Sequence, residues 1–129
     1  SQLARVDTSA YRLIRQHTPG PFTFILPATG NVPKSVQQRK TRTIGIRIPE
    51  HAVAQAIISA MDEPLLSSSL ILPGTQDEIM DNEDLFDAVH GMVDLFVDAG
   101  DCPLEPSTLV DLTGDQPLIL RQGRGVIEF

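Results

Sequence analysis

The chain has 129 residues, of which 41% are hydrophobic and 21% are charged, and its net charge is −7. This composition is typical of an ordinary globular protein and excludes disordered and fibrous proteins. A chain of this length buries ~68% of its unfolded surface on folding, which is enough for one hydrophobic core. No apolar run approaches the ~18 residues that span a bilayer, and no secretory signal pattern is present, so we expect a cytoplasmic protein without a membrane segment.

The charge is distributed unevenly along the chain. Residues 1–50 hold eight Lys and Arg against two Asp and Glu, whereas residues 51–129 hold two against fifteen. Several of these basic residues could form a phosphate-attracting surface; they are Lys34, Arg39, Lys40, Arg42 and Arg47. A solvated loop that needs charge for solubility explains them equally well. The overall acidity argues against tight binding of long nucleic acids, but a small phosphorylated ligand or a short RNA contact is compatible with it.

A helix and a strand are predicted first. Residues 8–17 carry apolar side chains at helical spacing, with Thr8 or Ser9 as the N-cap and a Pro-Gly pair after the last turn. Residues 22–26 are aromatic and β-branched, which indicates a buried strand. Because no strand precedes this helix, we expect the chain to be the C-terminal portion of a longer domain.

The next segments predict a short helix, a strand and a longer helix. Residues 33–38 predict the short helix, because proline is well tolerated in a first helical turn. In residues 43–48 three isoleucines alternate with Thr43, Gly45 and Arg47, which indicates a strand with one apolar and one polar face. Residues 53–61 have the apolar spacing of a helix that packs on a sheet.

The remainder of the chain predicts one more helix and four strands. Residues 81–91 predict an amphipathic helix with acidic residues in its first turn and a glycine at its end. The predicted strands cover residues 65–72, 93–97, 108–112 and 117–121. Helices alternate with strands, and short turns join the late strands, so we predict a single layered α/β domain over residues 1–129 with a mixed sheet.

The sequence lacks the motifs of the common catalytic centres. It contains no P-loop, no nucleophile elbow, no HExxH and no GxGxxG after a strand. Cys102 is the only cysteine, and the three histidines are scattered over separate segments. This spacing predicts neither a disulfide nor a metal site. We therefore predict no catalytic nucleophile and no metal ligands.

Polar side chains do occur at the ends of the predicted strands, where α/β sheets commonly bind ligands. These hydroxyl and arginine residues are Thr43, Arg47, Ser67, Ser69, Ser107, Thr108 and Arg121. A hydroxyl both donates and accepts hydrogen bonds, and the planar guanidinium suits carboxylate and phosphate. Together they indicate a polar pocket for an anionic ligand. Ordinary hydroxyls at loop boundaries and surface arginines are the alternative explanation.

Four segments in order also resemble motifs of one known family. They read PGPFTF from Pro19, TIGIRIPEH from Thr43, PLLSSS from Pro64, and STLVD with LRQG after Ser107. All four are similar to segments of the YrdC/YciO family. The serines before Ile71 and Ile71 itself resemble the YciO-like branch, because the synthases of the family have an asparagine at this position. The family's Lys-x-Arg nucleotide motif and its first threonine-binding segment precede the matched region, so we expect this chain alone to be inactive.

The resemblance implies a three-layer α/β fold with a twisted mixed sheet, flanking helices and a positive cavity. It implies a nucleotidyltransferase, a threonylcarbamoyl-AMP synthase, that joins L-threonine, bicarbonate and ATP with Mg²⁺ and supplies a separate transferase in tRNA modification. By position, the resemblance assigns nucleotide binding to Thr43, Ser69 and Arg121. It assigns threonine binding to Arg47, Ser67 and Ser107.

The YciO-like branch leaves a second interpretation open. For that branch the resemblance implies a non-catalytic module that binds double-stranded RNA or a nucleotide. The corresponding phosphate-binding patch is Lys34, Arg39, Lys40 and Arg42.

Overall fold

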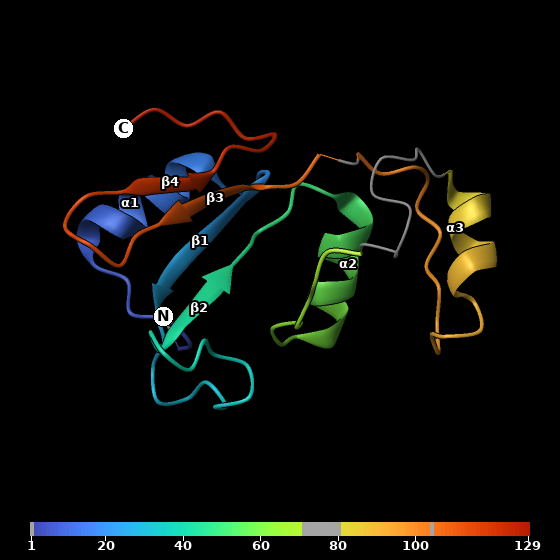
Figure 1. Cartoon of the computed structure of the whole chain (residues 1–129), viewed down its shortest axis with the longest axis horizontal. Coiled ribbons are helices and arrows are strands. Elements are labelled where there is room, and N and C mark those ends of the chain that lie inside the picture. Colours follow the sequence, from blue (N-terminus) through green and yellow to red (C-terminus); the bar gives the residue numbers. More distant parts are fainter. Residues whose placement is uncertain (1, 71–80, 104) are drawn as a thin grey trace. The chain divides into compact units, whose positions relative to one another are not determined.

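The computed structural model describes residues 2–70, 81–103 and 105–129 (Figure 1). The described chain divides into two compact units, of which the first comprises Ser1–Gln55 and Glu105–Phe129 and the second comprises Ala56–Leu104. The prediction of a single domain over residues 1–129 stays a prediction. The expected mixed α/β sheet is confirmed, and it lies entirely in the first unit.

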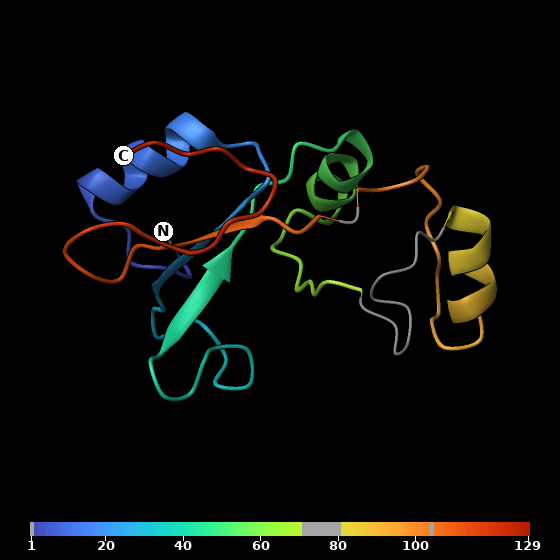
Figure 2. The same ribbon diagram turned by 45° about the horizontal axis from the view of Figure 1, so that its top comes forward.

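The first unit is built on a four-stranded sheet with the order β2-β1-β3-β4. Its strands are β1 (Phe22–Pro27), β2 (Thr43–Ile46), β3 (Thr108–Asp111) and β4 (Leu118–Arg121). Strand β1 pairs antiparallel with β2 and parallel with β3, and β3 pairs antiparallel with β4. The two central strands therefore come from opposite ends of the chain and lie side by side (Figures 1 and 2).

Helix α1 (Thr8–His17) supplies the apolar side chains that cover one face of this sheet. Phe22, Phe24 and Val110 are buried there, and Leu13 and Ile14 of the helix pack against them. The strand β1 alternates buried and half-buried residues along its whole length. Successive side chains of a strand point to opposite faces, so the intervening residues of β1 lie on the face away from the core.

The start of α1 corrects one prediction. Asp7, not Thr8 or Ser9, is the N-cap: its backbone is extended and its carboxylate accepts a hydrogen bond from the Ala10 amide at 2.8 Å. The two hydroxyl residues are already inside the first turn of the helix. An aspartate satisfies a free amide of the first turn as well as a serine or threonine does, so the sequence offered three adjacent candidates.

The segment between β1 and β2 corrects a second prediction. Residues 33–38 form a turn and no helix: the Val36 amide donates to the Pro33 carbonyl at 2.9 Å, and the chain then turns away. Gln38 forms an isolated bridge with Thr43, and its amide donates to the Thr43 carbonyl at 3.0 Å. The bridge between Gln38 and Thr43 closes residues 39–42 into a tight loop. The turn at residues 33–38 therefore cannot continue as a helix.

The strand predicted over residues 43–48 ends at Ile46. Beyond it, the Ile48 carbonyl accepts a hydrogen bond from the Gly20 amide at 2.9 Å, ahead of the first residue of β1. The chain therefore leaves the ladder but stays beside the start of β1.

The second unit is less regular than predicted. Helix α2 (Ala52–Met61) runs from the first unit into it, and α3 (Asn82–Val89) is capped by Asp81, whose carboxylate accepts from the Asp84 amide. The strands predicted over residues 65–72 and 93–97 are wrong for residues 65–70 and 93–97, while residues 71–72 lie outside the described part. Their apolar side chains are largely exposed, and an apolar run becomes a strand only where a partner strand pairs with it. Within the described residues, no helix is long and apolar enough to cross a bilayer.

A buried threonine joins the end of the chain to the start of β3. The Thr108 hydroxyl donates to the Gly125 carbonyl at 2.7 Å and accepts from the Gly123 amide at 3.0 Å. A Cβ at Gly123 would lie 2.6 Å from the carbonyl carbon and oxygen of Ser107. The backbone after β4 therefore passes directly against the backbone before β3, which a side chain at Gly123 would prevent.

Candidate ligand-binding site

One face of the sheet carries polar side chains, and we call it the polar face. It is the face opposite the Phe22, Phe24 and Val110 core, and directly paired residues of neighbouring strands share it. The strand registers pair Thr43 with Pro27, Gly45 with Ile25, and Arg121 with Leu109. This face includes Thr23, Thr43, Gly45, Ser107 and Arg121.

Three polar side chains of this face are joined by hydrogen bonds. The Thr23 and Ser107 hydroxyl oxygens lie 2.7 Å apart, across the junction of β1 with the start of β3. The Arg121 guanidinium donates to the Ser107 carbonyl from Nε at 3.1 Å and from Nη2 at 2.8 Å, and Nη2 also reaches the Ser107 hydroxyl at 3.3 Å. We call Thr23, Ser107 and Arg121 the hydroxyl–arginine cluster.

The anchoring of Arg121 leaves donors available. The forked hydrogen bond to one backbone carbonyl fixes the plane of the guanidinium, and none of the described residues is bonded to its Nη1. Arginine has five N–H donors, so those on Nη1 can still bind a carboxylate or phosphate oxygen. Arg121 is exposed and Ser107 and Thr23 are half-buried, so a ligand can reach the cluster.

Thr43 lies at the far end of the polar face. It pairs with Pro27, four residues along β1 from Thr23, and its hydroxyl is bonded to that of Thr41 at 2.8 Å. With a rise of ~3.3 Å per residue and ~4.8 Å between strands, Thr43 and Arg121 are ~20 Å apart. The structure therefore places two of the three predicted nucleotide-binding residues, Thr43 and Arg121, on one face but does not bring them into contact.

Arg47 lies nearer to the hydroxyl–arginine cluster than Thr43 does. It is the first residue after β2 and is exposed. The β1–β2 register ends with the pair of Phe24 and Ile46, so Arg47 is the first residue beyond the ladder. The hydrogen bond from Gly20 to Ile48 keeps this segment next to the start of β1. The predicted threonine-binding residues Arg47 and Ser107 therefore lie at the same end of the sheet, where β1 and β3 begin.

The two other predicted serines belong to the second unit. Ser67 and Ser69 are exposed and lie outside helices and strands. Their assignment to threonine and nucleotide binding stays a prediction. Ile71, on which the comparison with the YciO-like branch depends, lies outside the described residues.

The predicted phosphate-binding patch forms a loop at the end of β2. Arg39, Lys40 and Arg42 lie between the paired residues Gln38 and Thr43, and all three are exposed. The Arg42 amide donates to the Gln38 carbonyl at 2.7 Å, and Arg42 has a φ of 52°. Such a tight loop turns three basic side chains outward within four residues.

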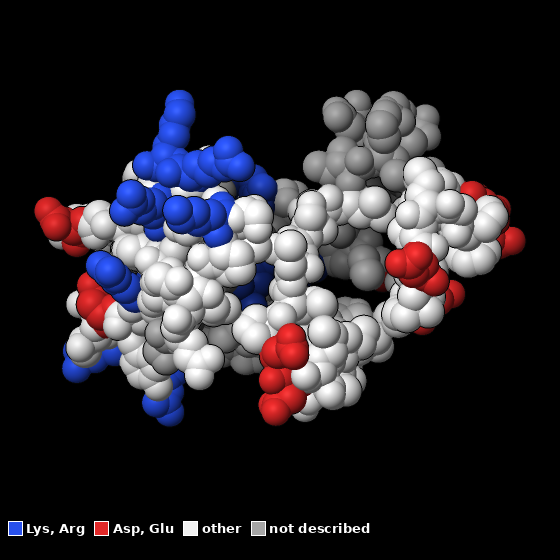
Figure 3. Space-filling view, turned by 90° about the horizontal axis from the view of Figure 1, so that it is seen from below, with Lys and Arg blue, Asp and Glu red and all other residues white. Residues whose placement is uncertain are grey.

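All basic residues of the chain lie in one of the two units. The first unit holds all ten Lys and Arg and six Asp and Glu, which is a net charge of +4. The second unit holds no Lys or Arg and eleven Asp and Glu, which is −11. Figure 3 shows the basic side chains gathered over the unit that carries the sheet. An anionic ligand is therefore attracted to the first unit.

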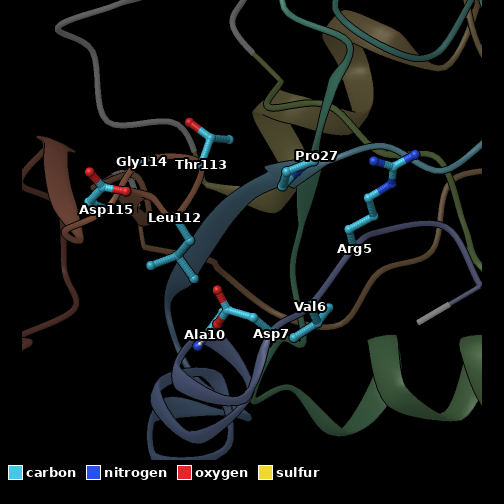
Figure 4. Close-up of a pocket in the computed structure, with 9 residues that line it drawn as sticks. All are labelled: Arg5, Val6, Asp7, Ala10, Pro27, Leu112, Thr113, Gly114 and Asp115. Carbon is cyan, nitrogen blue, oxygen red and sulfur yellow. Dashed lines mark hydrogen bonds between the residues drawn. The ribbon is translucent and has the colours of Figure 1, made fainter.

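A cavity of the first unit lies away from the polar face. It has a volume of about 480 Å³ and is lined by residues 5–7, Ala10, Pro27 and residues 112–115 (Figure 4). Two of its polar side chains are already engaged, because Asp7 caps α1 and the Thr113 hydroxyl donates to Asp111 at 2.6 Å. None of the predicted site residues lines it. We therefore base the candidate site on the chemistry of the polar face and not on this cavity.

The residues predicted for the site do not include Thr23, which the structure places in the hydroxyl–arginine cluster. The available signal was its position as the single polar side chain within the apolar run of residues 22–26. Its partner Ser107 is 84 residues away, so local periodicity carries no information about their contact.

Comparison with known proteins identifies relatives of this chain. A family model for Sua5, YciO and YrdC proteins, described as "Telomere recombination", matches residues 1–123. YciO of Escherichia coli is 42% identical over 123 residues, which are 95% of this chain and 60% of YciO. Its crystal structure matches 96% of this chain with a TM-score of 0.89. The chain thus spans about 60% of the length of this relative.

Two more distant relatives carry functional names. A threonylcarbamoyl-AMP synthase of Schizosaccharomyces pombe is 32% identical over 115 residues, which are 86% of this chain and 28% of that protein. The crystal structure of Pyrococcus abyssi Sua5 complexed with L-threonine has a TM-score of 0.82 at 26% identity. That match covers 95% of this chain and 36% of Sua5.

Proposed function

Because the chain belongs to the Sua5/YciO/YrdC family, we propose that its polar face is part of a site for L-threonine and a nucleotide. In the full-length protein, this site makes threonylcarbamoyl-AMP from L-threonine, bicarbonate and Mg-ATP. The observation that carries the proposal is the hydroxyl–arginine cluster, in which a guanidinium and two hydroxyls are fixed together on an accessible face. The names of the S. pombe and P. abyssi relatives supply the substrate class.

The threonine end of the site is assigned to Arg47 and Ser107. The amino acid offers a carboxylate, an ammonium group and a hydroxyl, and it needs a cation together with short-range hydrogen-bond partners. Arg47 supplies a planar fork for the carboxylate, and Ser107 supplies a hydroxyl beside it. Ser107 contacts Thr23 near the start of β1, and Arg47 follows the last residue of β2 at the same end of the sheet, so both can act on one small molecule. The assignment of Ser67 to the same substrate is part of this proposal.

The nucleotide end of the site is assigned to Arg121, Thr43 and Ser69. The ~20 Å between Thr43 and Arg121 suits an extended ligand such as ATP and excludes a small ion that touches both. Arg121 faces the phosphates through its remaining N–H donors, and Mg²⁺ bound to ATP would offset the rest of the charge. Catalysis then comes from orientation and charge neutralisation, for which no side-chain nucleophile is needed.

Replacing Arg121 tests this proposal. We expect the full-length protein to form threonylcarbamoyl-AMP from Mg-ATP, L-threonine and bicarbonate, measured by mass spectrometry. Arg121→Ala should lower its rate ~10–100-fold, because a hydrogen bond to a charged group contributes ~1.5–3 kcal/mol. Arg124→Ala is the matched control, since Arg124 is exposed and lies three residues later, outside the cluster.

Two outcomes would contradict this proposal. If the wild-type protein forms no adenylate, the synthase function is wrong. If the Arg121→Ala and Arg124→Ala variants react equally fast, the assignment of Arg121 to the nucleotide is wrong.

The charge division favours a second candidate function, a non-catalytic module that binds double-stranded RNA. The loop with Arg39, Lys40 and Arg42, together with Lys34, would contact the phosphates. Replacing Arg39, Lys40 and Arg42 together by Gln should reduce the slope of log affinity against log salt concentration by ~2 to 3, measured with a short RNA duplex. Each phosphate contact contributes ~0.9 to this slope.

The matched control for the RNA measurement removes the same charge elsewhere. Arg5, Arg12 and Arg15 are exposed and lie on or next to α1, so their replacement by Gln should leave the slope nearly unchanged. An affinity for RNA that does not change with salt concentration would rule this function out. An equal loss of affinity in the two triple variants would rule it out as well.

A further inference from the structure

We propose that Thr23 is a positioning residue of the threonine site, which directs a single O–H donor of the Thr23–Ser107 pair toward the substrate carboxylate. This inference rests on the proposed threonine site and assigns a role to a residue outside the predicted set. It is carried by the hydrogen-bond geometry of the hydroxyl–arginine cluster and by the glycine next to it on β2.

The Thr23 hydroxyl has no part in the core of the sheet. Phe22, Phe24 and Leu26 are buried on one side of β1, and Thr23 lies on the other side, half-buried. Among the described residues, its hydroxyl is bonded to the Ser107 hydroxyl alone, at 2.7 Å. A valine would occupy the same space in the strand, so the hydroxyl serves Ser107 and not the packing of β1.

The hydroxyl pair of Thr23 and Ser107 has one hydrogen that is free to bind a ligand. Each hydroxyl has one hydrogen and two acceptor sites, and one of the two hydrogens lies in the bond between Thr23 and Ser107. Arg121 occupies one acceptor site of Ser107. If Thr23 donates, both acceptor sites of Ser107 are filled, and Ser107 can only donate. If Ser107 donates, the free hydrogen is that of Thr23.

The pair therefore presents one free O–H beside a guanidinium in either arrangement. A lone O–H donor next to a positive charge suits an anionic oxygen, such as the carboxylate of an amino acid. Without the Thr23 hydroxyl, Ser107 keeps a free acceptor site and its hydrogen can rotate away from the substrate. Thr23 thus acts on the substrate by limiting the orientations of Ser107.

Gly45 leaves room for the Thr23 side chain in this orientation. It lies on the polar face of β2, and a Cβ there would lie 3.3 Å from the Thr23 methyl group. A side chain at position 45 would therefore crowd the methyl. Since a β-branched residue has few χ1 rotamers, the glycine leaves the rotamer that directs the hydroxyl toward Ser107 free of this crowding.

The test compares L-threonine binding by three forms of the full-length protein, measured by isothermal titration calorimetry. Thr23→Val removes the hydroxyl at constant shape and should raise the dissociation constant ~3–10-fold, the usual effect of one hydrogen bond. Thr23→Ser keeps the hydroxyl and should restore the affinity to within ~3-fold of wild type. Thr18→Val is the matched control, because its half-buried hydroxyl donates to the Ile14 carbonyl at the end of α1.

The outcomes separate this inference from the proposed function. If the wild-type protein does not bind L-threonine, the proposed threonine site is wrong and the role of Thr23 is wrong with it. If wild type binds but Thr23→Val binds equally well, the positioning role alone is wrong. If Thr23→Ser weakens binding as much as Thr23→Val does, a hydroxyl at position 23 is not enough to restore the affinity, which also overturns the inference.

Discussion

Gly123→Ala should lower the free energy of unfolding by ~3 kcal/mol, the upper end of the usual range for overpacking. The new Cβ would lie 2.6 Å from the carbonyl carbon and oxygen of Ser107, which are backbone atoms that no rotamer change can move away. One of the two chain segments must shift. The hydrogen bond from the Gly123 amide to Thr108 would then be lost from the buried interior.

The same change should disturb the ligand site. The Ser107 carbonyl that the alanine would displace is the acceptor that holds the Arg121 guanidinium. We therefore expect Gly123→Ala to weaken L-threonine binding as well as stability. Urea unfolding and calorimetry of the full-length protein measure the two effects.

Gly114→Ala is the matched control for this prediction. Gly114 lies in the turn between β3 and β4, where the nearest atom to a new Cβ is the Gln116 carbonyl oxygen at 3.9 Å. The substitution should change stability by no more than ~0.5 kcal/mol. Equal stabilities of the two alanine variants would show that the backbones near Gly123 are further apart than this structure has them.

Phe24→Ala should be the most destabilising single truncation in the sheet, by ~3–5 kcal/mol. Phe24 is 1% exposed on the central strand β1, and its ring stacks on that of Phe22 with centroids 5.9 Å apart. It belongs to the buried cluster with Val110 and Ile127, against which α1 packs. Removing the ring loses its burial and leaves a cavity between helix and sheet.

The control for Phe24 is Phe129→Ala. Phe129 is 64% exposed, so its truncation should cost less than ~1 kcal/mol. Urea unfolding monitored by circular dichroism compares the two variants with wild type. A loss of equal size for both would mean that the buried face of β1 is not the main core of the first unit.

Local pattern predicted the elements of the first unit well. The aromatic run of residues 22–26, the alternating isoleucines after Thr43, and the two late strands all became strands within one or two residues of their expected ends. Helix α1 matched its predicted range, although its N-cap did not. Each of these segments buries one side against the core. The spacing of its apolar residues in the sequence therefore matches the side that is buried.

The same reasoning failed where burial was missing. Residues 65–70 and 93–97 are apolar but largely exposed in the second unit, and no described partner strand pairs with them there. Residues 33–38 form a turn where a helix is predicted, because a proline is compatible with a turn as well as with the first turn of a helix.

The classes of residue at the candidate site and the charge around it follow from the amino-acid sequence alone. The arginines, the hydroxyls at the strand ends and the confinement of positive charge to part of the chain are all visible in the residue order. The motif spelling also indicated the family to which the chain belongs. These properties depend on residue identity and short spacing alone.

Which of these residues contact one another depends on the pairing of the strands in three dimensions. Pairing β1 with β3 brings Thr23 to Ser107 across 84 residues, and the register of β3 with β4 brings Arg121 to the same point. A shift of one residue in either register would turn these side chains to the other face of the sheet. The register is set by the packing of Phe22, Phe24 and Val110 under α1, so the hydrophobic core on one face positions the polar cluster on the other.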